Sequence, residues 1–385
     1  MKVLFVVSDS TAHGGTEVLT FNLMHELQRQ GVDCYLISRN LYKGENTHVL
    51  NMEHTELSHY RKLLNSPLNK ITGNRHSDTY LKNVIRIVAK ELQVDWIVNH
   101  TYDMCAAIPM DGPWKTAQVF HWSIDGYESN LKSVVQQKSF LNRILSFVSL
   151  SATIKQWHKA IPQFDRQVCL TKVAYTEIQR AGKLTTPSGI CHIPDPLMQS
   201  QECTEVSSLD NKTIVYVGRL SHEKGVMRLL RIWKQVSAQL VDYTLKIYGD
   251  GYMMDEMGQF IKSNSLPRVE LMGYSSDLKG IYTNADLCLL TSDTEGFGMV
   301  LIEAMYYGVP CVSFDCPISP KEIIADAGVT VTCFDETAYA NAVVGLLNDK
   351  GRLKELQLKS IARAKDFYID KVISLWLNML KSENK

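Results

Sequence analysis

The 385-residue sequence lacks net charge, paired cysteines and long hydrophobic runs. Its 41 Lys and Arg balance 41 Asp and Glu, so no global field attracts nucleic acid, and we expect no nucleic-acid partner. Its nine cysteines include no Cys-x-x-Cys pair, which argues against a zinc finger and against a disulfide scaffold. A reducing compartment and no bound metal are therefore expected.

No stretch is long and apolar enough to predict a membrane span or a signal peptide. The N-terminal apolar run covers only residues 3–7, shorter than the ~7 residues that a signal-peptide core needs. Hydroxyl side chains interrupt the most apolar stretch, 144–154, which is also shorter than the ~18 residues of a spanning helix. We expect a cytoplasmic protein that is soluble or bound peripherally to the inner face of the cell membrane.

Short apolar runs alternate with helical patterns along the chain, and 45% of the residues are hydrophobic. This alternation is typical of a parallel sheet covered by helices, and it recurs after a polar stretch at 200–211. We therefore predict an α/β fold with two doubly wound, Rossmann-like domains, 1–205 and 206–364. The predicted strands are 3–7, 33–38, 96–99, 117–120, 214–217, 244–248, 269–272, 287–290 and 310–314.

Basic residues concentrate in two stretches of the first half, 57–90 and 131–172. Each stretch carries seven Lys or Arg and one Asp, interleaved with apolar and aromatic residues. Such a surface fits an anionic membrane, where each Lys or Arg contributes about 1 kcal/mol. The alternative is a solvated helix face.

Two glycines, Gly14 and Gly15, precede the first predicted helix. Glycines there let the backbone approach a ligand closely, and helix N-terminal amides suit a phosphate. The pattern is not G-x-G-x-x-G, which disfavours a nicotinamide enzyme. The alternative is a tight turn that requires glycine.

A loop after the first strand of the second half carries Arg219 and Lys224, flanked by Gly218 and Gly225. Two cations at the carboxyl end of a strand can hold a diphosphate, Arg by a bidentate fork and Lys as a point charge. Two solvated loop charges are the alternative.

Glu295 and Glu303 are separated by seven residues, with Gly296 and Gly298 between them. The pattern places Glu295 at a strand end and Glu303 about one turn into an apolar helix. A carboxylate near a helix N-terminus is stabilised there and can accept two vicinal hydroxyls of a ribose.

Together these motifs resemble the GT-B glycosyltransferases of family 4, the retaining group with the E-x7-E signature. The resemblance covers most of the chain. A loop at 316–324 also resembles one in members that build bacterial surface polysaccharides, although Ser319 stands where those members commonly have Gly. The matching motifs are Gly14-Gly15-Thr16-Glu17, Gly218-Arg219, Glu223-Lys224-Gly225, Glu295-Gly296-Phe297-Gly298, Glu303 and Gly308-Val309-Pro310.

The resemblance implies two Rossmann-like domains that face each other across a cleft, with a C-terminal helix at about 365–385 returning to the first, acceptor-side domain. The second domain would bind the nucleotide-sugar donor. The implied donor-binding residues are Gly15, Arg219, Lys224, Tyr274, Glu295, Gly296, Phe297, Gly298, Met299 and Glu303. The implied catalytic residues are His121, Glu295, Arg219 and Lys224.

Each of these residues has an expected role. The resemblance assigns the donor diphosphate to Arg219 and Lys224, the ribose to Glu303, and the donor sugar to Glu295 and the amides of residues 296–299. It assigns the base to Tyr274, and the phosphates and the acceptor side to the Gly15 loop. His121, a better match than His100, would meet the donor sugar.

The implied activity is retaining transfer of a hexose or N-acetylhexosamine from a nucleoside-diphosphate sugar, with uridine favoured. The acceptor would be a saccharide or lipid-linked saccharide in bacterial polysaccharide biosynthesis, such as lipopolysaccharide or capsule. No metal or cofactor is expected, because Arg219, Lys224 and helix amides can stabilise the leaving diphosphate. The alternatives are a non-catalytic nucleotide-sugar-binding partner protein and a nucleotide-sugar epimerase on the same fold.

Overall fold

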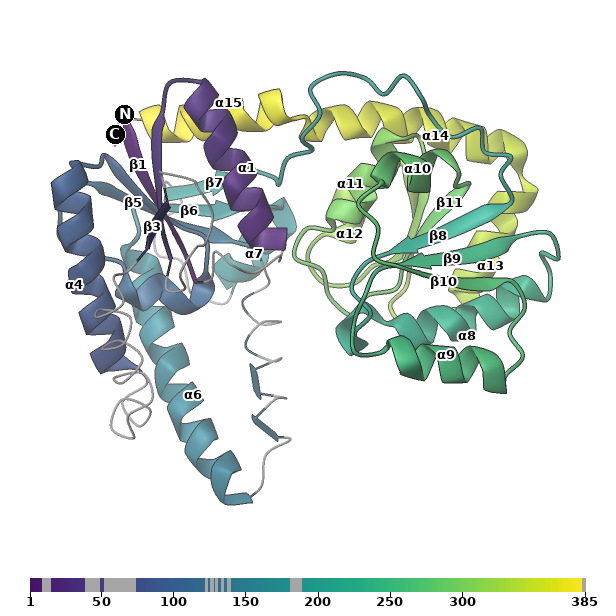
Figure 1. Cartoon of the computed structure of the whole chain (residues 1–385), viewed down its shortest axis with the longest axis horizontal. Coiled ribbons are helices and arrows are strands. Elements are labelled where there is room, and N and C mark those ends of the chain that lie inside the picture. Colours follow the sequence, from purple (N-terminus) through teal and green to yellow (C-terminus); the bar gives the residue numbers. More distant parts are fainter. Residues whose placement is uncertain are drawn as a thin grey trace. The chain divides into compact units, whose positions relative to one another are not determined.

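The computed structural model describes residues 1–8, 15–38, 49–51, 74–121, 140–180 and 189–382, together with 124, 128, 131–132 and 135–136. The chain divides into two compact units. The first unit comprises Met1–Pro194 and Ile373–Lys385, and the second comprises Asp195–Val372 (Figure 1).

The first unit contains a seven-stranded parallel sheet in the order β3-β2-β1-β4-β5-β6-β7. Strand β1, in the interior of the sheet, is buried along almost its whole length, as expected for a parallel sheet covered on both faces. The strands are β1 (Lys2–Val7), β2 (Asp33–Ser38), β3 (Val49–Asn51), β4 (Trp96–Asn99), β5 (Lys115–Phe120), β6 (Arg166–Cys169) and β7 (Ile190–His192). The helices are α1 (Gly15–Arg29), α4 (Arg75–Leu92), α6 (Phe140–Ala160) and α7 (Lys172–Arg180), with 3-10 turns η1 (Tyr102–Ala107) and η2 (Ile161–Gln163).

The second unit contains a six-stranded parallel sheet in the order β10-β9-β8-β11-β12-β13. Large buried aromatic side chains, Tyr216, Trp233, Phe314 and Tyr339, fill its core. The strands are β8 (Thr213–Val217), β9 (Thr244–Tyr248), β10 (Val269–Gly273), β11 (Leu287–Leu290), β12 (Cys311–Phe314) and β13 (Gly328–Val331). The helices are α8 (Val226–Ser237), α9 (Met254–Ser263), α10 (Leu278–Thr283), α11 (Met299–Tyr306), α12 (Pro320–Ile324), α13 (Glu336–Asn348) and α14 (Lys350–Ala364), with 3-10 turns η4 (His222–Lys224) and η5 (Lys365–Phe367). Helix α15 (Ile369–Lys381) begins in the second unit and continues into the first.

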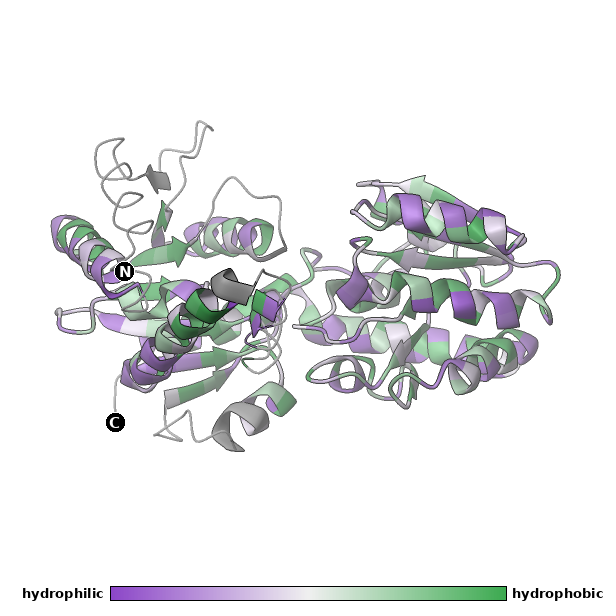
Figure 2. Cartoon of the chain, turned by 90° about the horizontal axis from the view of Figure 1, so that it is seen from below, coloured by the Kyte–Doolittle hydropathy of each residue, from purple (hydrophilic) through white to green (hydrophobic). Residues whose placement is uncertain are grey.

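Hydropathy follows this layering in both units. Figure 2 shows strands that are mainly hydrophobic and helices that carry hydrophilic residues along one side. Helix α8, for example, buries Leu229, Leu230 and Trp233 and exposes Arg231 and Lys234. This confirms the predicted α/β class, with two parallel sheets covered by helices.

The strand order of each sheet reverses at one place. In the first unit this place lies between β1 and β4, and in the second it lies between β8 and β11. The chain leaves two such neighbouring strands in opposite directions, so the loops at their carboxyl ends diverge. Open α/β sheets bind ligands at such switch points. A ligand-binding loop is therefore expected at the carboxyl ends of these strand pairs.

The polar stretch at 200–211 is part of the second unit. Ser207 Oγ donates a hydrogen bond to the carbonyl of Ala285 at 2.5 Å, and Leu209 is buried in the core. Leu197, farther upstream, already donates its amide to the carbonyl of Phe367. The units therefore separate between Pro194 and Asp195 rather than near residue 205, because short buried anchors hold a stretch that looks like a linker in composition.

The C-terminal segment returns to the first unit from Ile373 onward, within α15. The indole of Trp96, on β4, donates a hydrogen bond to the carbonyl of Leu380 at 3.0 Å. Lys115, on β5, donates from Nζ to the carbonyl of Ser382 at 2.8 Å. The segment thus attaches to two neighbouring strands of the first sheet.

Four predicted strands, 33–38, 96–99, 244–248 and 287–290, have the bounds that the structure shows. Strands β3, β6, β7 and β13 are absent from the prediction, because they have only three or four residues and lack a continuous apolar run. Within the described part of the chain, every helix is too short or too polar to cross a bilayer.

A candidate nucleotide-sugar site

Two loops of the second unit follow β8 and β11, the strands at its switch point. The first loop, residues 218–225, carries Arg219 and Lys224. The second, residues 291–298, carries Glu295 and leads into α11. Because neighbouring parallel strands end at the same edge of a sheet, the fold brings together motifs that lie about 70 residues apart in sequence.

The centre of this arrangement is a hydrogen-bonded ion pair between Lys224 and Glu295. Lys224 Nζ lies 2.7 Å from Glu295 Oε1, and the two side chains are 17% and 7% exposed. Ser292 Oγ also donates to Glu295 Oε1, at 2.5 Å. Buried charges need such partners because desolvation is costly. Glu295 lies in the loop between β11 and α11, not at the strand end that the sequence suggested.

Arg219 differs from Lys224 in its surroundings. Its side chain is 61% exposed, and its Nη1 lies 3.9 Å from Glu223 Oε1. Glu223 is partly buried, which opposes ionisation, but hydrogen bonds from Ser221 and the backbone and the nearby cations leave its pKa lowered. Arg219 is therefore the more accessible cation of the loop, while Lys224 is held by Glu295.

Hydrogen bonds join the two loops along their backbones. Thr291 Oγ1 lies 3.2 Å from the carbonyl oxygens of both Lys224 and Gly225, so its single proton is shared between them. The amide of Asp293 donates to the carbonyl of Glu223. Gly225 has a φ of +66°, and a Cβ there would lie 2.0 Å from the carbonyl oxygen of Thr291. Glycine is required at this position because the loops approach so closely.

Helix α11 begins after Gly298, which adopts a φ of +88°. The side chain of Phe297 is buried and packs edge-to-face against Phe367, with ring centroids 5.7 Å apart. Any contact from Phe297 to a ligand would therefore involve its backbone. This packing anchors the turn that connects Glu295 to the helix.

Glu303, the second acidic residue of the motif, is the fifth residue of α11 and is partly buried. The hydroxyl of Tyr282 lies 3.5 Å from Glu303 Oε2 and also contacts the carbonyl of Val300. Burial raises the pKa of Glu303 to about 7, although the Tyr282 hydrogen bond acts to lower it. The sequence analysis expected helix amides to stabilise the carboxylate, but desolvation is the larger effect at this depth.

Sequence reasoning missed a third loop at this edge, Gly249-Asp250-Gly251 after β9. The amide of Leu220 donates to the carbonyl of Asp250 at 2.8 Å, and a Cβ on Gly251 would lie 2.2 Å from the carbonyl oxygen of Leu220. The two closely spaced glycines were the available signal. Tyr274, the expected base contact, follows β10 and is 75% exposed.

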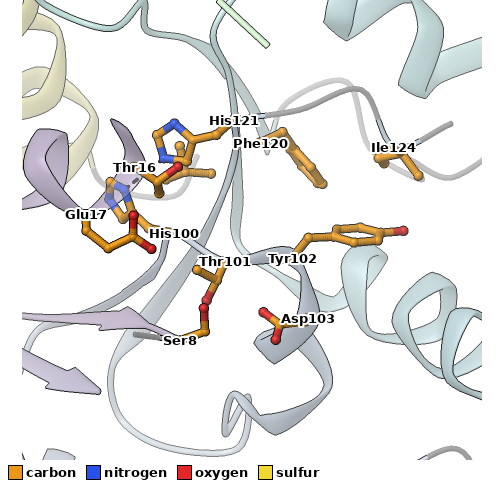
Figure 3. Close-up of a pocket in the computed structure, with 11 residues that line it drawn as sticks. Ser8, Thr16, Glu17, His100, Thr101, Tyr102, Asp103, Phe120, His121 and Ile124 are labelled. Carbon is orange, nitrogen blue, oxygen red and sulfur yellow. Dashed lines mark hydrogen bonds between the residues drawn. The ribbon is translucent and has the colours of Figure 1, made fainter. Parts of the chain in front are cut away.

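The first unit has its own cavity, of about 200 Å³, at the carboxyl ends of its central strands (Figure 3). His121 follows β5 and lines it, with Glu17 and Thr16 from α1 and Asp103 from η1. Gly15 is the first residue of α1, and Gly14 lies outside the described residues. The cavity thus combines two carboxyl groups, hydroxyl groups and two imidazoles, those of His121 and His100.

His100, which sequence reasoning set aside in favour of His121, lies against it in this cavity. His100 Nδ1 is 3.0 Å from His121 Nε2, and both side chains are nearly buried. The position of His100 directly after β4 was the available signal, because β4 and β5 are neighbours.

The cysteines form no disulfide, and most of them are buried. Across the described ranges, no three His, Cys, Asp or Glu side chains are grouped so that they could hold a metal ion.

The different surroundings of Lys224 and Arg219 generate a stability prediction. We expect Lys224→Ala to destabilise the ligand-free protein by about 3 kcal/mol, because it leaves the buried Glu295 carboxylate without its cation. Arg219→Ala should change the stability by less than about 0.5 kcal/mol, because the side chain is exposed. Chemical denaturation followed by circular dichroism measures both. Equal effects of the two substitutions would contradict the assignment of the ion pair.

Comparison with known proteins gives three further findings. Residues 211–349 match the family model described as Glycosyl transferases group 1. An uncharacterized glycosyltransferase of Haemophilus influenzae is 25% identical over 384 residues, which cover 98% of this chain and 99% of that protein.

Two solved structures share the fold of the whole chain. The lipopolysaccharide outer core galactosyltransferase WaaB, in its apo form, has a TM-score of 0.69 at 17% identity, with 99% of each chain covered. HepE of Anabaena, in complex with UDP, has a TM-score of 0.73 at 17% identity, with 100% of each chain covered. Residues 211–349 are therefore similar to the Glycosyl transferases group 1 domain, within a chain whose two-domain α/β fold is that of these two solved structures, the GT-B fold.

Proposed function

We propose that the protein is a retaining glycosyltransferase that moves a hexose or N-acetylhexosamine from a UDP-sugar to a saccharide or lipid-linked saccharide. The observation that carries this proposal is the convergence of Lys224, Glu295 and Arg219 in two hydrogen-bonded loops at the β8/β11 switch point. The group 1 domain spans these loops, and the HepE structure of the same fold contains UDP.

Each group at this edge suits one part of a nucleotide sugar. In the proposed complex the exposed Arg219 binds the diphosphate, and Lys224 shares its charge between the diphosphate and Glu295. Glu303, on α11, accepts hydrogen bonds from the ribose, and Glu295 with the amides of residues 296–299 meets the sugar. Tyr274 contacts the base.

Transfer requires stabilisation of the negative charge that develops on the leaving diphosphate. We assign this to Arg219, Lys224 and the N-terminal amides of α11, because donors placed in advance need little reorganisation during the reaction. No metal is part of this proposal, so activity should persist in EDTA. His121 is assigned to the donor sugar, and the cavity that contains His121 and the Gly15 segment to the acceptor side.

A peripheral membrane position is a further part of the proposal, and helix α6 favours it. Figure 1 shows that the first turns of α6 extend well beyond the sheet of the first unit. Four apolar side chains there are about half exposed or more: Ile144, Leu145, Phe147 and Val148. The helix contains no Asp or Glu and exposes Arg143, Lys155 and Lys159, so we propose that an anionic bilayer is its partner.

Some of the other predicted basic residues lie outside the described part of the chain or have partners within the protein. In stretch 57–90, residues 57–73 lie outside the described part of the chain, and Arg86 is paired with Asp111 at 2.8 Å. In stretch 131–172, Arg166 hydrogen-bonds to the backbone of Asp165 and to Ser382. The proposed membrane surface is therefore the exposed part of α6.

Nucleotide binding is the first prediction of the proposed function. UDP should raise the melting temperature more than GDP or ADP at equal concentration, because a ligand that binds only the folded state stabilises it, by about 2.7 kcal/mol at 100 Kd. Arg219→Ala should abolish the shift without changing the ligand-free melting temperature. Arg352→Ala, an exposed Arg on α14, serves as the control and should retain the shift. If no nucleotide stabilises the wild-type protein, the donor site is misassigned.

The raised pKa of Glu303 generates the second prediction. A folded protein that holds this proton more tightly than the unfolded chain loses stability as the pH rises from about 4.5 to about 7. Glu303→Gln should therefore match the wild type near pH 4.5 and be more stable at pH 8, as measured by urea denaturation at both values. A variant that is less stable than the wild type at pH 8 would contradict the raised pKa.

The ribose assignment adds a ligand-dependent consequence to this measurement. An ionised carboxylate accepts hydroxyl hydrogen bonds better than its neutral form, so the wild-type affinity for UDP should rise between pH 6 and pH 8 more steeply than that of Glu303→Gln. Because UDP is the same in both titrations, its own phosphate ionisation cancels. Parallel curves would argue against contact between Glu303 and the ribose.

Membrane binding is the third prediction. The wild-type protein should sediment with vesicles that contain phosphatidylglycerol but not with phosphatidylcholine vesicles, and high salt should release it. The double variant Leu145→Ser with Phe147→Ser should lose most of this binding. Leu358→Ser, an equally exposed residue on α14, is the matched control. Equal binding to both vesicle types would contradict the proposal.

A further inference from the structure

The contact between His100 and His121 has a specific hydrogen-bonding arrangement. Thr20, on α1, donates its hydroxyl proton to the carbonyl of Thr16 at 2.7 Å. Its Oγ1 also lies 3.1 Å from His100 Nδ1. A hydroxyl group has one proton, so this second contact requires His100 Nδ1 to be the donor.

The same ring nitrogen of His100 has a second neighbour. His121 Nε2 lies 3.0 Å from His100 Nδ1, and two N–H groups cannot face each other at this distance. His121 Nε2 must therefore present a lone pair. A neutral His121 with a bare Nε2 carries its proton on Nδ1.

The environment of His100 keeps this arrangement in place. Burial, with the nearby His121 as a smaller cause, lowers the pKa of His100 well below its ordinary value, so the ring is neutral and has a single N–H. Trp376 of α15 stacks on the ring with an interplanar angle of 14°, and Phe5 of β1 contacts it at a centroid distance of 5.5 Å. These contacts fix the plane of the imidazole.

The other nitrogen of His100, Nε2, indicates that the contribution of this residue lies in the hydrogen bonds of Nδ1. His100 Nε2 is buried and has no hydrogen-bond partner among the described residues. A buried polar atom without a partner is costly, and a phenylalanine would fill the same space without this cost. The hydrogen bonds of Nδ1 are therefore the part of His100 that an apolar ring could not provide.

We propose that His100 is a positioning residue that holds His121 in the tautomer protonated on Nδ1. His121 then carries an N–H, rather than a lone pair, on the nitrogen that His100 does not engage. In the proposed complex this N–H donates to a hydroxyl or anionic oxygen of the sugar substrate. The catalytic meaning of this role rests on the proposed function, whereas the tautomer is a property of the ligand-free protein.

Two variants separate the hydrogen bond from the packing. His100→Asn places an amide N–H close to the position of Nδ1 and retains the donor. His100→Phe keeps an aromatic ring against Trp376 and removes both the donor and the unpaired Nε2. Melting temperatures identify any variant that fails to fold, and the tautomer of His121 in the wild-type protein then remains the test.

The measurement is long-range ¹H–¹⁵N NMR of the histidine rings at one neutral pH, without ligand, with the His121 signals assigned through His121→Gln. We expect His121 to be protonated on Nδ1 in the wild type and in His100→Asn. In His100→Phe it should shift toward the Nε2-protonated form that free imidazole side chains favour. Turnover of the donor sugar should fall about 10- to 100-fold in His100→Phe, the range for loss of the outer partner of a metal-bound histidine, and should recover in His100→Asn.

Different results overturn different parts of this scheme. An Nε2-protonated His121 in the wild type, or an unchanged tautomer in His100→Phe, overturns the positioning role whatever the activity. A tautomer that shifts as expected while turnover stays at the wild-type level overturns its catalytic meaning. A wild-type protein that shows the expected tautomer but transfers no sugar overturns the proposed function and leaves the hydrogen bond to His121 established.

Discussion

The reversal of strand order in each parallel sheet is the constraint on which the candidate sites depend. Parallel strands present their carboxyl ends at one edge, and only where the order reverses do consecutive loops diverge enough to leave room for a ligand. Residues 218–225 and 291–298 follow β8 and β11 at this place, and His100 and His121 follow β4 and β5 beside the corresponding place in the first unit. Charged and polar residues that are far apart in sequence therefore lie close together simply because their strands are neighbours in the sheet.

At the carboxyl edge of the second sheet, charged side chains are stabilised mainly by partners within the protein. Glu295 is buried with Lys224 and Ser292, whereas Glu303 has one long hydrogen bond, from Tyr282, and a raised pKa. The two carboxyl groups of one short motif thus have different surroundings, because Glu295 has a cation beside it, whereas desolvation is the main influence on Glu303. A raised carboxyl pKa such as that of Glu303 commonly marks a residue that acts on a ligand.

The sequence predicted the α/β class, several strand bounds and the loops that approach one another, because apolar runs and glycine patterns are local signals. It did not predict the Lys224–Glu295 ion pair, which depends on the exact path of two loops. It placed the unit boundary too late, because the anchors Ser207 and Leu209 are single residues within a polar stretch. His100 was passed over because its role arises only through β5, its neighbour in the sheet but not in the sequence.

The attachment of the C-terminal segment to the first sheet also determines the order in which the protein can be completed. Trp96 and its partner Leu380 are 284 residues apart, and Trp376 covers the ring of His100. The second unit is continuous from Asp195 to Val372, so all of its strands have been synthesised before these last residues exist. During synthesis from the N-terminus, the first unit is therefore begun first and completed last. A chain that is interrupted before its C-terminal segment contains His100 and His121 but lacks Trp376, which covers the ring of His100.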